Sequence, residues 1–262
     1  MLRPRQVLAL FPLLLIGFAA RADVTEEFQR TLPLTADGSL SVSNVNGAID
    51  ITSWDRNEVE IRATKRADDR EELAEIQIEI EAEEGSISVE TELPEGRNRG
   101  GSVEYHIQAP QGASIHTEAV NGRVRIAGSR GGVHAETVNG AIELEEVAGA
   151  LHVETVNGSA NVVYAETPAE GEHSFESVNG AIRVAFPSSV AGEFEAETVN
   201  GSIETDFPLQ VTKARFGPSS SLQGRVGTGG GQFRFETVNG SIRILNREKT
   251  ASTVRYHLDR KP

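Results

Sequence analysis

The stretch Glu-Thr-Val-Asn-Gly-Ala-Ile at residues 136–142, with a near copy at 197–203, decides how this chain folds. Its central Val-Asn-Gly occurs seven times in the 262 residues. The shorter gaps between successive asparagines are 18 to 22 residues, and both longer gaps hold a degraded copy, at 84–89 and at 223–226. A fixed period of this size indicates a repeat architecture. The asparagines, which we expect to form a ladder of structural turns, are Asn46, Asn121, Asn139, Asn157, Asn179, Asn200 and Asn239.

Each repeat unit contains a second turn signal and an alternating pattern. A glycine stands eight residues before the asparagine in six of the seven copies, so both turns use residue types that tolerate positive φ. Between the turns, Val133, Ala135 and Thr137 would face one way and His134 and Glu136 the other. A period of two predicts β-strands, two per unit. A helix is expected only near 67–75, within a charged insert at about 64–84.

Two all-β architectures fit two strands per unit. Asn-Gly between alternating strands is a strong hairpin signal, which would give an antiparallel β-meander. The alternative is a single-domain parallel β-solenoid, in which each 18–22-residue unit is one coil stacked on the previous coil. A meander would leave one apolar face uncovered, because the chain has almost no helix to cover it. We therefore expect the solenoid, which stacks equivalent residues about 4.8 Å apart.

Stacking in sequence order predicts columns of equivalent side chains. The position four after the asparagine would place Arg125 beside Glu143 and Arg183 beside Glu204, as compensated pairs on a solvated face. Trp54 follows the first copy and is expected to serve packing more than sugar binding. The residues expected in the core are Val124, Ile142, Ile182, Ile203 and Ile242, together with Leu144, Val184, Phe175 and Phe235.

The position three before the asparagine is acidic in all six later copies. Like charges about 4.8 Å apart repel by roughly 1 kcal/mol in water, so such a column needs cations, protonation or a bound metal ion to relieve it. Histidines stand two residues earlier in three copies, so His–Glu compensation on an exposed polar column is expected. A cation-binding column, with calcium at the glutamates or zinc at the histidines, stays open as an alternative. The candidate metal ligands are Glu118, Glu136, Glu154, His116, His134 and His152.

The first 22 residues resemble a signal peptide. Arg3 and Arg5 precede an apolar run from Val7 to Ala20, and residues 20–22 fit a small-x-small cleavage site. The apolar run is short for a membrane span. We expect an exported mature chain of residues 23–262 without a transmembrane segment, periplasmic or extracellular. Loss of the three arginines in this segment would change the formal charge from −14 to −17.

Composition and motifs exclude several classes of function. With 39 acidic and 25 basic side chains the chain lacks the basic footprint of a nucleic-acid binder. It has no cysteine, so disulfides, thiolate metal sites and cysteine nucleophiles are excluded. No catalytic signature of a serine hydrolase, phosphate-binding loop or zinc protease is present, so no catalytic residue and no cofactor is expected.

The repeated residues 136–142 and 197–203, and the order of parts from residues 45–55 through the charged insert to 103–110, resemble the "putative adhesin" family of bacterial β-strand-repeat proteins. The resemblance covers about residues 35–245. It implies an exported or envelope-associated β-solenoid of unassigned molecular role, with no established catalytic residues to carry over.

These observations predict a non-catalytic, adhesin-like β-solenoid that binds or scaffolds through a repetitive acidic face. Its partner would be a surface glycan or an envelope protein. The alternative is a polysaccharide-active β-helix enzyme, for which the segments 90–101 and 227–231 are the candidate insertions. A third possibility is end-to-end self-association through the terminal strands.

Overall fold

The computed structural model describes residues 23–93, 101–166, 170–213 and 219–249. The expected signal peptide at 1–22 and most of the 90–101 segment lie outside these ranges.

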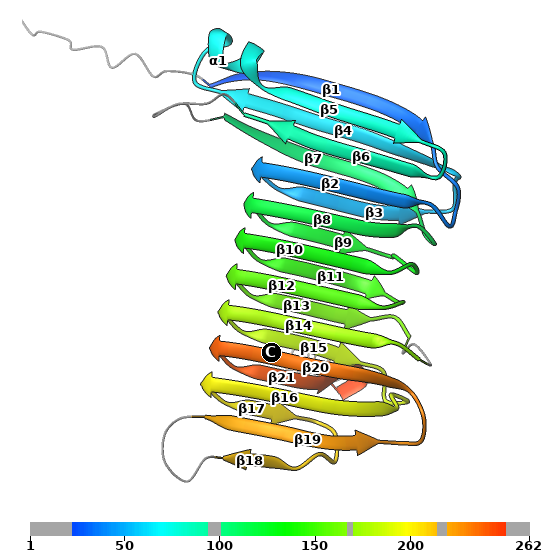
Figure 1. The fold of residues 1–262 in the computed structure, drawn as a ribbon, viewed down its shortest axis with the longest axis vertical. Coiled ribbons are helices and arrows are strands. Elements are labelled where there is room, and N and C mark those ends of the chain that lie inside the picture. Colours follow the sequence, from blue (N-terminus) through cyan, green and yellow to red (C-terminus); the bar gives the residue numbers. More distant parts are fainter. Residues whose placement is uncertain (1–22, 94–100, 167–169, 214–218, 250–262) are drawn as a thin grey trace, which may run out of the picture.

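The described chain is all-β apart from short helical turns, and its strands form two large sheets (Figure 1). Sheet A contains, in spatial order, β1 (Val24–Pro33), β4 (Glu58–Ala67), β7 (Gly101–Pro110), β3 (Ile49–Trp54), β9 (Val124–Ala127), β11 (Ile142–Val147), β13 (Ala160–Tyr164), β15 (Ile182–Phe186), β21 (Ile242–Asn246) and β17 (Ile203–Thr205).

Sheet B lies in front of sheet A in Figure 1. It contains, in spatial order, β18 (Val211–Lys213), β19 (Ser220–Val226), β16 (Gly192–Asn200), β20 (Gly231–Asn239), β14 (Glu172–Asn179), β12 (Leu151–Asn157), β10 (Val133–Asn139), β8 (Ser114–Asn121), β2 (Ser39–Asn46), β6 (Ser86–Glu92) and β5 (Gln77–Glu83). Helix α1 (Arg70–Glu75) lies within the stretch where a helix was expected, and the side chain of Asp69 caps its first turn.

Each repeat unit contributes one strand to each sheet. The chain runs along sheet B, turns at Asn-Gly and continues in sheet A, as in β10 followed by β11. Equivalent strands of neighbouring units then pair in parallel, with Asn139 opposite Asn121 on one side and Asn157 on the other. The two strands that flank an Asn-Gly turn therefore belong to different sheets, so the β-meander alternative is wrong. The all-β, β-solenoid-like expectation is confirmed.

The sheets are mixed and not purely parallel. At one end β1 pairs antiparallel with β4, β4 with β7, and β5 with β6. At the other end β19 pairs antiparallel with both β16 and β18. The degraded copy at 84–89 forms part of β6, which pairs in parallel with β2. The copy at 223–226 lies in the antiparallel strand β19 and is not a further coil of the series.

The spatial order of the coils differs from their sequence order. The last unit, β20 and β21, lies between the unit of β14 and β15 and the unit of β16 and β17 (Figure 1). This placement brings Phe235 into a stack on Phe175, with ring centroids 5.0 Å apart, and Phe233 onto Phe194 at 4.8 Å. Stacking in sequence order would leave both aromatic side chains of the last unit at an open end, so burial of aromatic surface favours the insertion.

The seven asparagines form one continuous hydrogen-bonded ladder. Each side-chain amide donates to the side-chain oxygen of the neighbouring coil, with N···O distances of 2.9–3.0 Å. At its first rung, Asn46 Nδ2 donates to the carbonyl of Gly101 at 3.1 Å. An amide offers both a donor and an acceptor, so a column of identical asparagines can satisfy itself along its whole length.

The threonine and glycine of the repeat hold the coils close together at the same corner. Thr155 Oγ1 donates to the carbonyl of Gly140 in the preceding coil at 3.2 Å, and Thr137, Ser177, Thr198 and Thr237 make the equivalent bond. A Cβ on Gly158 would lie 1.7 Å from the same Gly140 oxygen. Among the Asn-Gly glycines only Gly47 has a positive φ. The expected reason therefore holds at Gly47 and is wrong at the other six, where close approach of backbones, and not turn conformation, requires glycine.

The core lies between the two sheets. The aliphatic column predicted from the sequence is confirmed, since Val124, Ile142, Ile182 and Ile242 are fully buried and Ile203 is 5% exposed. The further residues predicted for the core are also fully buried, namely Leu144, Val184, Phe175 and Phe235. The outward-facing positions of the same strands are thereby left as flat, regularly spaced surfaces.

Candidate binding surface

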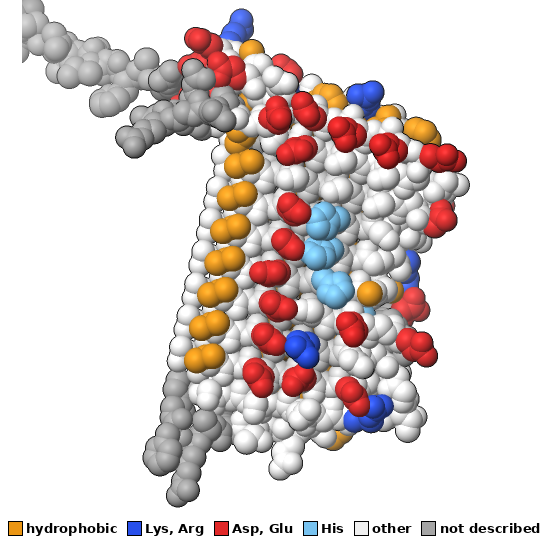
Figure 2. All heavy atoms as spheres, in the orientation of Figure 1, with side chains coloured by type: hydrophobic (Ala, Val, Ile, Leu, Met, Phe, Trp, Pro, Cys, Tyr) orange, Lys and Arg blue, Asp and Glu red, His pale blue; other side chains and the backbone are white. Residues whose placement is uncertain are grey.

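The outer face of sheet B carries three parallel columns of side chains. On each central strand the residues five, three and one before the ladder asparagine point outward, because successive side chains of a strand alternate between faces. On β10 these are His134, Glu136 and Val138. Figure 2 shows the columns over the front sheet, hydrophobic at the edge, acidic beside it and histidine farther in. Parallel register extends the hydrophobic column across seven coils, the acidic column across six and the histidine column across three.

The acidic column is continuous over six strands. Glu236 lies between Glu176 and Glu197, so the inserted last unit extends the column without interruption. The complete order, which we call the Glu column, is Glu118, Glu136, Glu154, Glu176, Glu236 and Glu197. At a strand spacing of about 4.8 Å each carboxylate has a like charge on one or both sides.

Neighbouring side chains relieve part of this repulsion. His116 lies 2.8 Å from Glu118, and His134 lies 2.5 Å from Glu136. Farther along, Ser174 donates to Glu176 at 2.8 Å, and Arg234 lies 3.7 Å from Glu236. No hydrogen bond or ion pair relieves Glu154 or Glu197 within the part of the chain that the structure describes. The column is therefore compensated at some coils and bare at others.

The predicted metal ligands lie on three adjacent strands. The histidine rings lie tilted against one another, with centroid distances of 4.7 Å for His116–His134 and 5.9 Å for His134–His152, beside the first three residues of the Glu column. No group of three or more His, Asp or Glu among the described residues is arranged so that it could hold a metal ion. Cation binding at these six residues stays a prediction.

An exposed valine stripe flanks the Glu column, and sequence reasoning missed it. The six most exposed valines are between 37% and 55% accessible, and Val156 is half-buried. The alternation of side chains along a strand could have predicted the stripe, because the residue two positions after an outward-facing glutamate also faces outward. The valine stripe consists, in spatial order, of Val45, Val120, Val138, Val156, Val178, Val238 and Val199.

A shallow groove runs between the Glu column and the valine stripe. Two hollows of about 220 Å³ each make up the groove. The first is lined by Glu118, Glu136 and Glu154 on one wall and by valines of four coils on the other. The second begins at Glu154 and continues past Glu176, Glu236 and Glu197. The groove therefore has one acidic and one apolar wall along its length.

A further cavity, of about 630 Å³, opens on the same face toward β16 and β19. Acids and bases line it together, and Glu193 pairs with Arg225 while Glu195 lies 3.4 Å from Arg234. The glycine-rich segment 227–231 is a turn from β19 into β20, with positive φ at Gly227.

The outer face of sheet A carries compensated charges, in a pattern that differs partly from the predicted one. Arg125 stands opposite Glu143, as predicted, but its ion pairs are with Asp50 at 3.3 Å and Glu145 at 2.6 Å. Arg183 does not stand beside Glu204, which is a correction. The inserted strand β21 places Arg243 between them, and Arg243 pairs with Glu204 at 3.0 Å.

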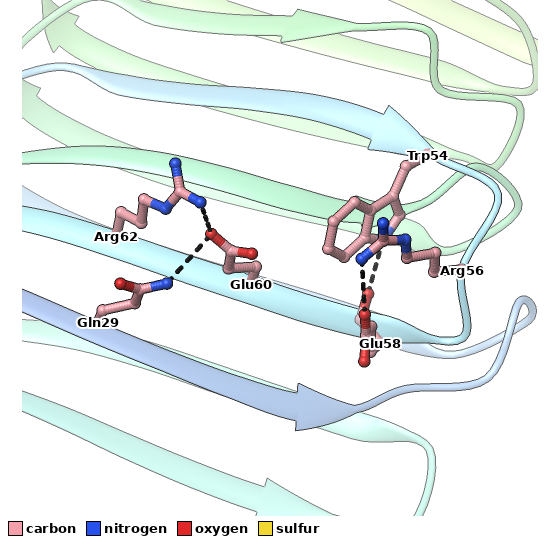
Figure 3. Close-up of polar contacts among 6 residues, drawn as sticks. All are labelled: Gln29, Trp54, Arg56, Glu58, Glu60 and Arg62. Carbon is pink, nitrogen blue, oxygen red and sulfur yellow. Dashed lines mark hydrogen bonds and ion pairs between the residues drawn. The ribbon is translucent and has the colours of Figure 1, made fainter.

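Trp54 is partly covered at the end of β3. Its indole nitrogen donates to the carbonyl of Glu58 at 2.8 Å, and the Arg56 guanidinium lies 4.7 Å from the ring centroid (Figure 3). Glu60, close by on β4, contacts Arg62 and accepts from Gln29 at 3.4 Å. Both the nitrogen and one face of the indole are thus engaged by neighbouring residues, and the packing role of Trp54 stays a prediction.

One histidine lies inside the molecule. His173 is 1% exposed and stacks on Phe233 at 4.7 Å. Its Nδ1 accepts from Tyr164 Oη at 2.7 Å and lies 3.3 Å from the amide nitrogen of Leu151, while its Nε2 has no partner among the described residues. Burial lowers the pKa of His173 to about 4, with a smaller contribution from the charge of His152. The fold therefore holds this ring neutral.

The fold and its columns define a class of protein, the β-solenoid-like repeat proteins, in which equivalent side chains line up across coils. The model of the Toastrack DUF4097 family matches residues 19–245, and the chain belongs to this family. The resemblance predicted from the repeats is thus confirmed. A search of the curated proteins found no match.

Several solved structures are similar to the chain, among them the following two. The first is a "putative cell adhesion protein" from Clostridium sporogenes, 14% identical, with 84% of this chain and 100% of that chain covered and a TM-score of 0.44. The second is a "putative adhesin" from Bacteroides fragilis, 11% identical, with coverages of 84% and 97% and a TM-score of 0.33.

Proposed function

We propose that this protein is a non-catalytic, adhesin-like binding or scaffolding module of the cell envelope that acts through the repetitive acidic face of sheet B. The observation that carries the proposal is the Glu column, six carboxylates in register on adjacent strands. Like charges at this spacing destabilise the fold, and the packing of the core between the sheets does not require them. A binding role for this surface would account for their presence.

Repetition supplies the mechanism of binding. Identical groups at coil spacing offer a ligand the same contact several times, and contacts within one complex add through effective concentration. A ligand with a regular array of cationic or hydrogen-bonding groups would therefore bind far more tightly than one such group alone. A surface glycan or an envelope protein would meet this description.

The export expected from the first 22 residues supports an envelope location. The first 22 residues have the composition of a signal peptide, and they lie outside the described residues. Within the described ranges, no helix combines the length and the apolar character needed to cross a membrane. The compartment that fits the proposed role is the periplasm or the extracellular side of the envelope.

A binding screen tests the proposal. Glycans, cationic polymers and divalent cations would be compared on the wild-type protein and on a variant with Glu118→Gln, Glu136→Gln and Glu154→Gln. We expect ligands that bind the wild type and bind the variant more weakly. Ligands whose affinity is unchanged by neutralisation would refute a role for the acidic face, and turnover of a glycan would refute the non-catalytic assignment.

End-to-end self-association is a second mode of assembly that the proposal includes. Strands β1 and β5 form the sheet edges at one end of the stack and β17 and β18 at the other (Figure 1). Unpaired edges offer backbone donors and acceptors to another strand. Light scattering that rises with protein concentration would support association, and a constant monomer mass over the same range would exclude it.

A further inference from the structure

The valine stripe is an apolar surface that the core does not explain. Seven β-branched side chains lie in a line on the outer face of sheet B, over a length of about 29 Å at the usual strand spacing. Because these side chains point away from the core, they make no packing contacts between the two sheets. Contiguous exposed apolar surface bordered by charge is typical of interaction sites.

The charge of the neighbouring wall restricts the occupant of the groove. A second copy of this chain would bring another acidic column against the Glu column, and the chain carries a formal charge of −14. An anionic membrane surface would be repelled for the same reason. A basic partner with an apolar side is complementary to both walls.

The spacing of the columns selects among basic partners. An α-helix advances about 5.4 Å per turn, close to the roughly 4.8 Å between coils, so each turn can place one apolar and one basic side chain against one coil. In an extended strand, residues on the same face are about 6.6 Å apart and leave register by nearly 2 Å at every coil. Within one coil, Val138 and Glu136 are two residues apart, about 6.6 Å, which fits two adjoining stripes of a helix.

We propose that the groove between the valine stripe and the Glu column binds an amphipathic α-helix of about five turns, with its apolar stripe on the valines and its lysines or arginines on the glutamates. This inference rests on the proposed binding function and names the partner of the same face. The bare carboxylates of Glu154 and Glu197 are the positions where a partner's cations would gain most.

A labelled peptide tests the inference. The probe is a helical peptide of about 18 residues of leucine, lysine and alanine, with leucine and lysine on adjoining stripes. Its control has the same composition in an order without stripes. We expect the striped peptide to bind the full-length protein about tenfold more tightly than the shuffled one, since only the striped peptide can use both walls. Equal binding of the two peptides would overturn the proposal.

Three variants separate the contributions of the walls. Val138→Thr, Val156→Thr and Val178→Thr together keep the β-branched shape and remove apolar surface. Glu136→Gln, Glu154→Gln and Glu176→Gln together remove three charges. The matched control, Glu79→Gln, Glu81→Gln and Glu83→Gln, removes the same charge from the edge strand β5, outside the groove. Thermal melting verifies that each variant is folded.

The two groove variants should each weaken the striped peptide about tenfold, and the β5 variant should leave its affinity within about twofold. Unchanged affinity in the valine variant would show that the stripe is not a docking surface. If neither peptide binds but the binding of a cationic ligand still depends on the Glu column, the helical partner is wrong and the proposed acidic binding face is supported. If neutralising the Glu column changes the affinity of no ligand, both the helical partner and the acidic binding face are refuted.

Discussion

His173 makes the stability of this protein depend on pH in a calculable way. Its pKa is lowered to about 4 in the folded protein, whereas an unfolded histidine has a pKa of about 6.5. As the pH falls through 6.5, His173 becomes protonated in the unfolded chain but stays neutral in the folded chain, so the unfolded state is stabilised relative to the folded state. The resulting decrease in the free energy of unfolding begins near pH 6.5 and is complete just below pH 4.

The two pKa values set the size of the effect. Between pH 8 and pH 5 this one residue should remove about 2 kcal/mol from the free energy of unfolding, and about 3 kcal/mol by pH 4. The ring is buried at 1% exposure, so solvent screens the effect little. With an m-value of about 3 kcal/mol per molar, 2 kcal/mol corresponds to a shift of about 0.7 M in the urea midpoint.

The test compares urea unfolding of the wild type and His173→Asn at pH 8, 6 and 5. Asparagine keeps an acceptor near the Nδ1 position for Tyr164 and Leu151, and it does not titrate. It loses the stack on Phe233, so the variant should be less stable at pH 8 by about 2 kcal/mol or more.

Groups that titrate in both proteins cancel in the difference between them. We expect the gap between wild type and variant to narrow by about 2 kcal/mol from pH 8 to pH 5. A gap that stays constant over this range would show that His173 is not held neutral by the fold.

Three further predictions concern the repeat corner and the Glu column. Gly158→Ala should lower the free energy of unfolding by several kcal/mol, because its Cβ meets a carbonyl at 1.7 Å, whereas Gly132→Ala, with its nearest atom at 3.7 Å, should be tolerated in the same thermal melts. Asn139→Ala breaks two ladder bonds and should cost about 2 kcal/mol, twice the cost of Asn200→Ala, which breaks one; equal losses in chemical denaturation would contradict a ladder. Glu154→Gln relieves two like-charged neighbours and should raise the melting temperature at low salt, with a smaller rise at high salt; a fall would show that the charge is compensated.

The sequence predicted the repeat, the β-strands and the face to which each residue points. Val-Asn-Gly fixes the corner, and the alternation at Val133 to Thr137 assigns the core side correctly. The same alternation places Val138 outward, but no role was assigned from the sequence to the valine of Val-Asn-Gly, so the exposed stripe was not predicted.

The order of the coils could not be read from the repeat. Every coil presents the same backbone hydrogen-bonding groups to its neighbours, so the repeat in the sequence is compatible with any stacking order. The choice depends on packing between side chains far apart in sequence, such as Phe175 on Phe235. The charge partners of Arg183 and Glu204 depend on that order, and both were assigned wrongly with it. The glycine of Asn-Gly was assigned to turn conformation because its contact partner, a carbonyl of another coil, is visible only in the folded chain.

The asparagine ladder also bears on how long the molecule survives. Asn-Gly is the dipeptide most prone to lose ammonia, because the glycine nitrogen can attack the asparagine side chain and close a succinimide. Here the amide of Gly140 is bonded to the carbonyl of Asn157, and the carboxamide of Asn139 is bonded on both sides. The attacking atom and its target are therefore both engaged while the coils stay stacked. Deamidation should therefore begin at coils that open. Each asparagine converted to aspartate would add a negative charge beside the acidic face, so the stacked coils slow a chemical change that would alter their own surface.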